Sequence, residues 1–438
     1  MKNYTFFLAS IFLCLLVLSC NNKKTNETEL EAIETVISDP VFVHLSDVHL
    51  NSFADTCTYG QDTGQDLWSI TKNKLTSVLS TEPIPKFVVY TGDLPAHYSC
   101  QDHVCFLKPN SPERATHVQN LKVILDDMRS LVEDNNIPFF YMPGNNDAIG
   151  GDYYSFADAK GNTPLSLVDT TGVTDLYPAL NTAANCGSPP CIQSSPHPTM
   201  GYYSVQAITG LRIIAMNSII LGRKYHSLDG VSQVDAGNAQ MTWIGNELEA
   251  AKLVGDKVFL TMHIPPGEDA YGVTHGDQTN MWAHLPNPGP EWQDQFLTLC
   301  EKYQSTITGI LYGHTHMDEL RRFYTADGNS ISEVAISAPG ITPQHYNNPG
   351  FKIVSFDATS FELTDFTTQY STPQAETWGN KSYQFSEIFG CGEDATIYDC
   401  LSSRSLTEVA DSMDIIYTVM NGDTTYNPKS GIDVRFGQ

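Results

Sequence analysis

Six short apolar runs, each followed directly by polar residues, restrict the fold of this 438-residue chain more than any other feature. Each run has the length and the β-branched and aromatic content of a buried strand. The runs are Pro40–Leu45, Lys86–Tyr90, Ile137–Met142, Leu211–Met216, Lys257–Met262 and Thr308–Tyr312. Helix-like segments lie between them, at Leu67–Leu79, Arg114–Glu133, Asn238–Leu253 and Trp292–Tyr303. Strands that alternate with helices predict an α/β fold.

The second half of the chain indicates further strands and then a change of pattern. Residues 333–361 read as strands joined by Gly and Pro turns. We expect one catalytic domain over residues 39–370. Residues 371–438 are predicted to form a small helical extension packed on it.

The N-terminus has the pattern of an export signal. Lys2 precedes an apolar run from Phe6 to Leu18, followed by Ser19 and Cys20. A positive start, a short apolar core and a small residue before the cut site are typical of a secretory signal. The segment 17–20 also resembles a bacterial lipobox, so we expect lipidation of Cys20, with residues 1–20 as signal and 21–38 as tether. The alternative is an ordinary cleaved signal with Cys20 incidental. Either way the protein is predicted to be exported, as an envelope lipoprotein or in secreted form.

The cysteines suggest disulfides. Two of ten lie in the signal, and an even number remains in an exported chain. Three pairs are close in sequence: Cys100/Cys105, Cys186/Cys191 and Cys391/Cys400. Pairing these leaves Cys57 for Cys300, although Cys57 could instead join Cys100 or Cys105. No CxxC pair supports a zinc knuckle.

The net charge of −26 argues against nucleic-acid polymers as partners, because binding to their phosphates depends on Lys and Arg. Solubility is the simplest explanation of so acidic a chain, and we expect a monomer. Bound cations can reverse the local field, so phosphate could still bind at a metal site.

Potential metal ligands follow five of the six predicted strands. Carboxyl ends of strands in α/β sheets are where ligands gather, because the loops converge there. Carboxylates, imidazoles and amide oxygens are the donors that divalent cations need. Each such residue alone is more often a turn or an ordinary histidine. Together, in this order, they predict one metal site: Asp47, His49, Asp93, Asn145, His263, His314 and His316.

The ordered set D-x-H, G-D, G-N, H and G-H-x-H resembles the calcineurin-like metallophosphoesterase superfamily, over residues 41–366. Longer stretches are similar to the acid sphingomyelinase and sphingomyelinase-like phosphodiesterase branch. They are GDLPAH (92–97), MTWIGNELEAAKLVGDKV (241–258), HIPPG (263–267), GHTHMDEL (313–320) and APGITPQHYNNPGFKIVSFD (338–357). The resemblance implies a two-sheet β-sandwich flanked by helices.

The resemblance also implies roles for the site residues. Two divalent cations are expected, zinc first, with manganese or iron as alternatives. Asp93 would bridge them, and a bridging water or hydroxide would attack phosphorus. His97 would protonate the leaving oxygen or stabilise the phosphoryl charge. One cation would take Asp47, His49, Asp93 and His316, and the other Asp93, Asn145, His263 and His314.

Asn146 departs from the family pattern, which has histidine after the metal-binding asparagine. An amide can donate to a phosphoryl oxygen but is no general acid at neutral pH. We also expect no separate saposin-like lipid-binding domain.

Two substrate classes remain open for the expected phosphodiesterase. One is a phospholipid head group such as phosphocholine, and the other is a nucleotide. Loop aromatics could enclose a choline by cation–π contacts: Tyr153, Tyr154, Tyr271, Trp282 and Tyr346. A phosphoanhydride hydrolase or phosphomonoesterase of the same superfamily is the alternative enzyme. A catalytically dead surface binding protein is the third reading.

Overall fold

The computed structural model describes residues 39–97, 111–167, 189–276, 280–285, 291–392, 394–422 and 426–438. The predicted signal, the tether and Cys20 lie outside these ranges, so their roles stay predictions. Within these ranges, no helix is both long and apolar enough to cross a membrane.

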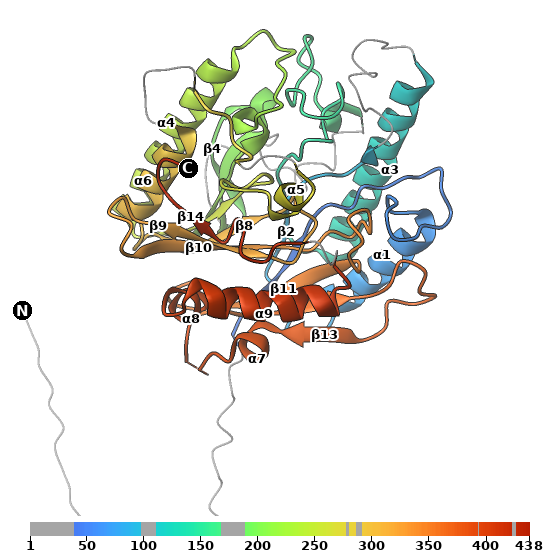
Figure 1. Ribbon diagram of the computed structural model, residues 1–438. Coiled ribbons are helices and arrows are strands. Elements are labelled where there is room, and N and C mark those ends of the chain that lie inside the picture. The colour runs from blue at the N-terminus through green and yellow to red at the C-terminus, as the bar shows by residue number, and fades with distance from the viewer. Residues whose placement is uncertain are drawn as a thin grey trace, which may run out of the picture. The chain divides into compact units, whose positions relative to one another are not determined.

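Two mixed β-sheets form the centre of the molecule (Figure 1). The first sheet has the order β13-β12-β11-β1-β2-β3 and the second β14-β9-β10-β8-β7-β6-β5-β4. The strands of the first sheet are β1 (Val41–Leu45), β2 (Val88–Tyr90), β3 (Phe139–Tyr141), β11 (Gly350–Phe356), β12 (Leu363–Tyr370) and β13 (Lys381–Gln384). Those of the second are β4 (Cys191–His197), β5 (Tyr202–Ile208), β6 (Leu211–Ala215), β7 (Lys257–Thr261), β8 (Ile307–Tyr312), β9 (Leu320–Tyr324), β10 (Ile331–Ser337) and β14 (Asp433–Val434). The expected α/β arrangement of two sheets is confirmed.

Each sheet contains a run of neighbouring parallel strands, at one end of the first sheet and at the centre of the second. In the first sheet β1, β2 and β3 run parallel. In the second, β6, β7, β8 and β10 do. Each parallel set therefore ends its strands at one edge, which is where the predicted ligands follow.

The sheets pack face to face through aromatic side chains. Phe42 and Phe87 stack with ring centroids 5.1 Å apart, beside β1 and β2. Phe259 of β7 lies 5.5 Å from Phe42 across the interface, and Phe356 of β11 lies 6.1 Å from Phe259. All four are fully buried, so this cluster supplies part of the hydrophobic stabilisation of the sandwich.

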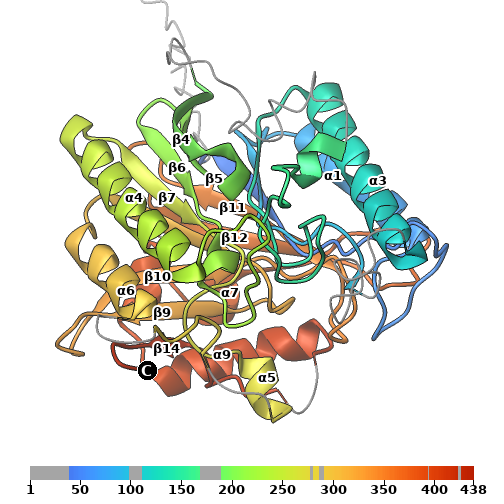
Figure 2. The same ribbon diagram turned by 90° about the horizontal axis from the view of Figure 1, so that it is seen from above.

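Helices flank the sandwich on both sides (Figures 1 and 2). Helices α4 (Gln233–Val254) and α6 (Trp292–Lys302) pack on the second sheet, whereas α1 (Gln65–Leu79) and α3 (Pro112–Asn135) contact each other on the opposite side. Helix α4 begins five residues before the expected start, because the Ser232 hydroxyl caps it by accepting from the Asp235 N–H.

Residues 371–438 join both sheets rather than forming helices alone. Strand β13 extends the first sheet through β12, and β14 extends the second through β9. Between these strands lie α7 (Phe385–Phe389), α8 (Ile397–Ser402) and α9 (Leu406–Val419).

The cysteine predictions have mixed outcomes. The disulfide Cys391–Cys400 is confirmed. Cys191 is also disulfide-bonded, whereas Cys100, Cys105 and Cys186 lie outside the described residues. The Cys57–Cys300 pairing is wrong, and so is a bridge from Cys57 to Cys100 or Cys105, because Cys57 and Cys300 are free thiols. They are buried in separate hydrophobic clusters: Cys57 lies in the cluster that includes residues of α1 and α3, and Cys300 in the cluster that includes residues of α4 and α6.

Candidate metal centre

Backbone hydrogen bonds hold the ligand-bearing loops together. The Asp47 N–H donates to the Gly92 carbonyl at 2.9 Å, which joins the loops after β1 and β2. The Gly313 N–H donates to the His263 carbonyl at 3.1 Å, which joins the loops after β7 and β8. The His314 N–H donates to the Asp47 carboxylate at 3.0 Å, which links the two sheets. Loops far apart in sequence therefore meet at one edge.

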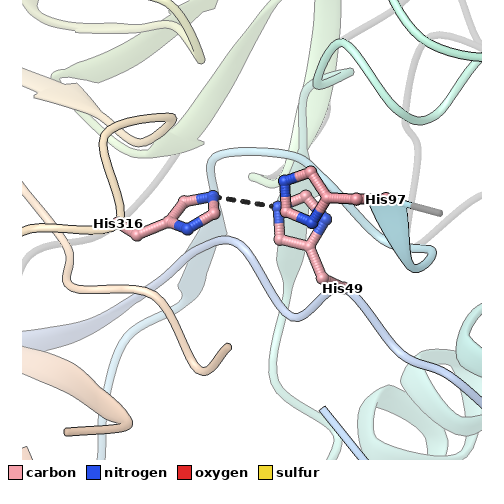
Figure 3. Close-up of side chains that lie close together, drawn as sticks. All are labelled: His49, His97 and His316. Atoms are coloured by element: carbon pink, nitrogen blue, oxygen red, sulfur yellow. Dashed lines mark hydrogen bonds between the residues drawn. The ribbon is translucent and has the colours of Figure 1, made fainter. Parts of the chain in front are cut away.

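Four predicted ligands form the first cluster, with their donor atoms within 4.8 Å of one another. The Nε2 atoms of His49 and His316 are 3.1 Å apart (Figure 3). Asp47 Oδ1 lies 3.5 Å from His316 Nε2, and Asp93 Oδ2 lies 3.3 Å from His49 Nε2. All four side chains are buried. Two imidazoles and two carboxylates that face one point are a donor set for a divalent cation.

A second cluster contains Asp93, His263 and His314, again with donor atoms within 4.8 Å. Asp93 Oδ2 lies 3.2 Å from His263 Nε2. Asn145 Oδ1 lies 3.0 Å from the same nitrogen. The two clusters therefore share one oxygen atom, Oδ2 of Asp93.

Charges in the site favour a bound cation. Burial alone would lower the pKa of His49 and of His263, but the neighbouring Asp93 carboxylate raises both, that of His263 to about 9. The carboxylates therefore attract positive charge to this point, as protons or as metal ions. Burial lowers the pKa of His314 and of His316, so these imidazoles stay neutral, the form that binds metal.

Two of the imidazoles are fixed in one tautomer. His49 Nδ1 lies 3.1 Å from the Pro95 carbonyl oxygen, and His263 Nδ1 lies 2.6 Å from the Thr91 carbonyl oxygen. A carbonyl only accepts, so each Nδ1 must carry the hydrogen. Each Nε2 therefore faces the cluster, where it can carry a proton toward Asp93 or, once that proton is displaced, bind a metal ion.

The backbone of the ligand loops is strained. Five predicted ligands have positive φ angles, a region that non-glycine residues rarely adopt. The angles are 49° at Asp47, 45° at His49, 64° at Asp93, 75° at His314 and 61° at His316. Such conformations cost about 1–3 kcal/mol each and gather at functional sites.

The glycines before three ligands serve two different purposes. Of the three, only Gly92 has a positive φ, of 98°, which a glycine adopts readily at a sharp turn. A Cβ on Gly144 would lie 2.2 Å from Asp93 Oδ1, and one on Gly313 would lie 2.0 Å from Ser46 Oγ. Gly144 and Gly313 are therefore needed because other groups approach the backbone closely.

His97 lies against the first cluster. Its ring stacks on His49, with centroids 3.7 Å apart, and a ring nitrogen lies within 4.8 Å of those of His49 and His316 (Figure 3). The carboxylate of Asp62 is 2.7 Å from His97 Nδ1 and accepts from the His97 N–H at 3.0 Å. Asp62 was missed from the sequence, because it stands 35 residues before His97 in a loop with no motif.

Asn146 contacts the shared carboxylate. Its N–H donates to Asp93 Oδ1 at 2.7 Å and its Nδ2 donates to Asp93 Oδ2 at 3.0 Å. The side chain is almost fully buried. Asn146 therefore orients the oxygen that both clusters share.

Two further acids, Asp147 and Asp152, support the ligands and were also missed. Asp147 accepts from the N–H groups of Leu94 and Gly144, each at 2.6 Å, which ties together the loops after β2 and β3. Burial and the nearby Asp93 raise the pKa of Asp147 to about 6. Asp152 accepts from Asn145 Nδ2 at 2.8 Å, which turns Asn145 Oδ1 toward His263. Asp147 was missed because nothing in the sequence GNND (residues 144–147) distinguishes this aspartate from an ordinary turn residue.

A family model for calcineurin-like phosphoesterases matches residues 40–318. The chain belongs to this family. The match covers β1 to the end of the GHTH loop, and with it every predicted ligand. The superfamily expected from the motifs is confirmed.

Curated relatives confirm the expected branch. Sphingomyelinase phosphodiesterase D of Dictyostelium discoideum is 28% identical over 317 residues, 72% of this chain and 61% of that protein. Sphingomyelin phosphodiesterase 1 of Caenorhabditis elegans is 25% identical over 328 residues, 72% of this chain and 49% of that protein. The mouse cyclic GMP-AMP phosphodiesterase SMPDL3A is 28% identical over 179 residues, 39% of this chain and 37% of that protein. The matched region spans less than two thirds of each relative.

Proposed function

We propose that this chain is an exported phosphodiesterase that holds two divalent cations at the carboxyl edge of its sheets. The observation that carries the proposal is the single oxygen of Asp93 that lies 3.3 Å from His49 Nε2 and 3.2 Å from His263 Nε2. A carboxylate oxygen shared by two donor clusters is suited to bridge two cations. The family match and the phosphodiesterase relatives support the same activity.

Each cation would have four protein ligands. One would be held by Asp47, His49, Asp93 and His316, and the other by Asp93, Asn145, His263 and His314. These nitrogen and oxygen donors suit zinc, with manganese and iron as alternatives. When bound, the cations supply Lewis-acid charge at the phosphoryl group and make water acidic enough to act as nucleophile near neutral pH.

The protein's own contribution to the reaction is proton delivery and positioning. Water adds to phosphorus, the bond from phosphorus to the leaving oxygen breaks, and the leaving oxygen takes a proton. His97 is placed to supply that proton, because it stacks on a ligand at the edge of the first cluster. Asp62 holds the His97 ring in place by its contact with Nδ1. Asn146 keeps Asp93 oriented through two hydrogen bonds.

Sphingomyelin phosphodiesterases among the relatives favour a phospholipid head group as substrate. The relative named for cyclic GMP-AMP favours a nucleotide as the second candidate. Both are phosphodiesters, so the chemistry proposed for the site is the same.

Turnover of bis(para-nitrophenyl) phosphate tests the proposed activity without a choice of natural substrate. We expect activity that disappears with a chelator and returns with zinc or manganese. Asp93→Asn should lower kcat/KM by roughly a thousandfold, because charge stabilisation at the site is lost. Asp365→Asn, in β12, is a control that should retain activity. Chelator-resistant turnover, or full activity of Asp93→Asn, would refute the proposal.

Export and lipidation of Cys20 are proposed from the N-terminal sequence. Metabolic labelling with palmitate should mark the wild-type chain and leave a Cys20→Ala variant unlabelled. Equal labelling of both chains, or none of either, would argue against the lipoprotein.

A further inference from the structure

A cavity of about 360 Å³ opens beside His314 and brings two basic residues next to the metal centre. Its other lining residues are Tyr153, Arg223, Lys224, Ile264, Asp269 and Met281. The chain has 24 Lys and Arg against 50 Asp and Glu, so two adjacent cations at this place run against the overall charge. A positive side chain near a phosphoryl site attracts anionic groups and repels cationic ones.

Tyr153 connects the basic residues to the centre. Its N–H donates to the Asn145 carbonyl at 2.8 Å, and its hydroxyl lies 3.4 Å from His314 Nε2. Its own carbonyl accepts from the His226 N–H at 2.9 Å, which joins it to the segment that carries Lys224. The Lys224 ammonium lies 5.3 Å from the centre of the Tyr153 ring. The basic segment is therefore attached to the loop of a predicted ligand.

Three of the five aromatic residues that could have enclosed a choline are engaged in contacts within the protein. Tyr271 stacks with His275 at 4.1 Å and with His345 at 4.2 Å. Trp282 is buried, and its indole N–H donates to the Ile264 carbonyl at 3.0 Å. Lys224 lies over the ring of Tyr153. These contacts disfavour a quaternary ammonium at this side of the site.

Resting on the proposed phosphodiesterase activity, we propose that Arg223 and Lys224 form a subsite for a second phosphate next to the scissile one. Preferred substrates then carry two or more phosphates, as nucleoside polyphosphates do, and phosphocholine esters are disfavoured. Tyr153 and Met281 supply apolar surface in the same cavity for the organic part of such a substrate. Water would split the bond between phosphorus and the bridging oxygen, and the released phosphate would take the proton.

Three probes test the subsite: ATP, bis(para-nitrophenyl) phosphate and para-nitrophenyl phosphorylcholine. Beside the scissile phosphorus, ATP carries extra negative charge, the bis-ester carries no further charge, and the phosphorylcholine ester carries a positive charge. In an Arg223→Gln/Lys224→Gln variant, we expect the ratio of kcat/KM for ATP to that for the bis-ester to fall roughly tenfold. The ratio of kcat/KM for the phosphorylcholine ester to that for the bis-ester should rise, because the substrate's ammonium group is no longer repelled by Arg223 and Lys224. A general loss of folding or of metal would lower kcat/KM for all three probes together. It would not make one ratio fall while the other rises.

Lys252→Gln is the matched control, because Lys252 is also an exposed cation that lies over a tyrosine ring. Its ammonium nitrogen is 5.6 Å from the centre of the Tyr303 ring. Its ratios should equal those of the wild type. Unchanged ratios in the double variant would overturn the subsite while leaving the proposed activity intact. Absence of turnover of all three probes by the metal-loaded wild type would instead overturn the proposed function.

Discussion

Two buried polar clusters in this molecule differ in how their charges are satisfied. Between the sheets, Lys352 forms an ion pair with Asp318, and Tyr383 and Thr368 donate to the same carboxylate. Lys352 Nζ also lies 3.1 Å from Thr368 Oγ1. This cluster pairs a cation with an anion and surrounds both with hydrogen bonds, so it needs no ligand from outside.

The metal centre instead gathers groups that mostly accept. The oxygens of Asp47 and Asp93 converge on His49 Nε2, and the buried Nδ1 of His316 has no hydrogen-bond partner in the described chain. Burial of such groups is costly unless positive charge compensates them. The comparison teaches that a buried cluster with matched charges is structural, whereas converging acceptors on strained backbone indicate a ligand site.

The sharpest way to break the structural cluster is to remove its cation. Lys352→Met should destabilise the protein by about 3–5 kcal/mol, because Asp318 is left buried without its partner. Denaturant unfolding measures the loss, and the activity of the folded fraction should be retained. Lys381→Met, in the exposed edge strand β13, is the control and should change stability little. A loss below about 1 kcal/mol for Lys352→Met would show that the pair is not a structural element.

The pH dependence of stability sharpens the same comparison. Burial lowers the pKa of Lys352 to about 8, so the folded protein releases this proton at lower pH than the unfolded chain does. Stability should therefore rise between pH 8 and the ordinary lysine pKa, by about 3 kcal/mol. Subtracting the unfolding free energy of Lys352→Met at each pH isolates this contribution. A difference that stays flat, or falls, across that range contradicts the assignment.

A smaller effect is expected at the edge of the metal centre. Asp62→Asn should lower kcat/KM about tenfold to a hundredfold for an alkyl phosphodiester, because His97 loses its orienting carboxylate. The loss should be much smaller for a para-nitrophenolate leaving group, which departs without a proton. Asp66→Asn, an exposed neighbour in α1, should leave both rates unchanged. Equal losses on both substrates in Asp62→Asn would exclude a role in proton delivery.

The fold, and the strand ends at which the predicted ligands lie, were predictable because they rest on local patterns. Each apolar run of strand length ends at the carboxyl edge of a sheet. The sequence alone therefore predicts that a residue directly after such a run, such as His263, lies at that edge. Asp62 and Asp152 could not be predicted, because their partners are chosen by tertiary contacts rather than by spacing. Strand β14 has only two residues and gains its place from pairing with β9. Cys57 and Cys300 were paired by elimination, which ignores that burial can keep thiols apart.

The number of divalent cations per chain tests the central claim most directly. Elemental analysis of protein purified without chelator should find two per wild-type chain. Asp93→Asn should lose both or bind them far more weakly, whereas His314→Ala should retain one, because the first cluster does not contain His314. The two-cation site would be contradicted if the wild-type chain bound no divalent cation. It would also be contradicted if the chain bound a single cation even when saturated with zinc, manganese or iron.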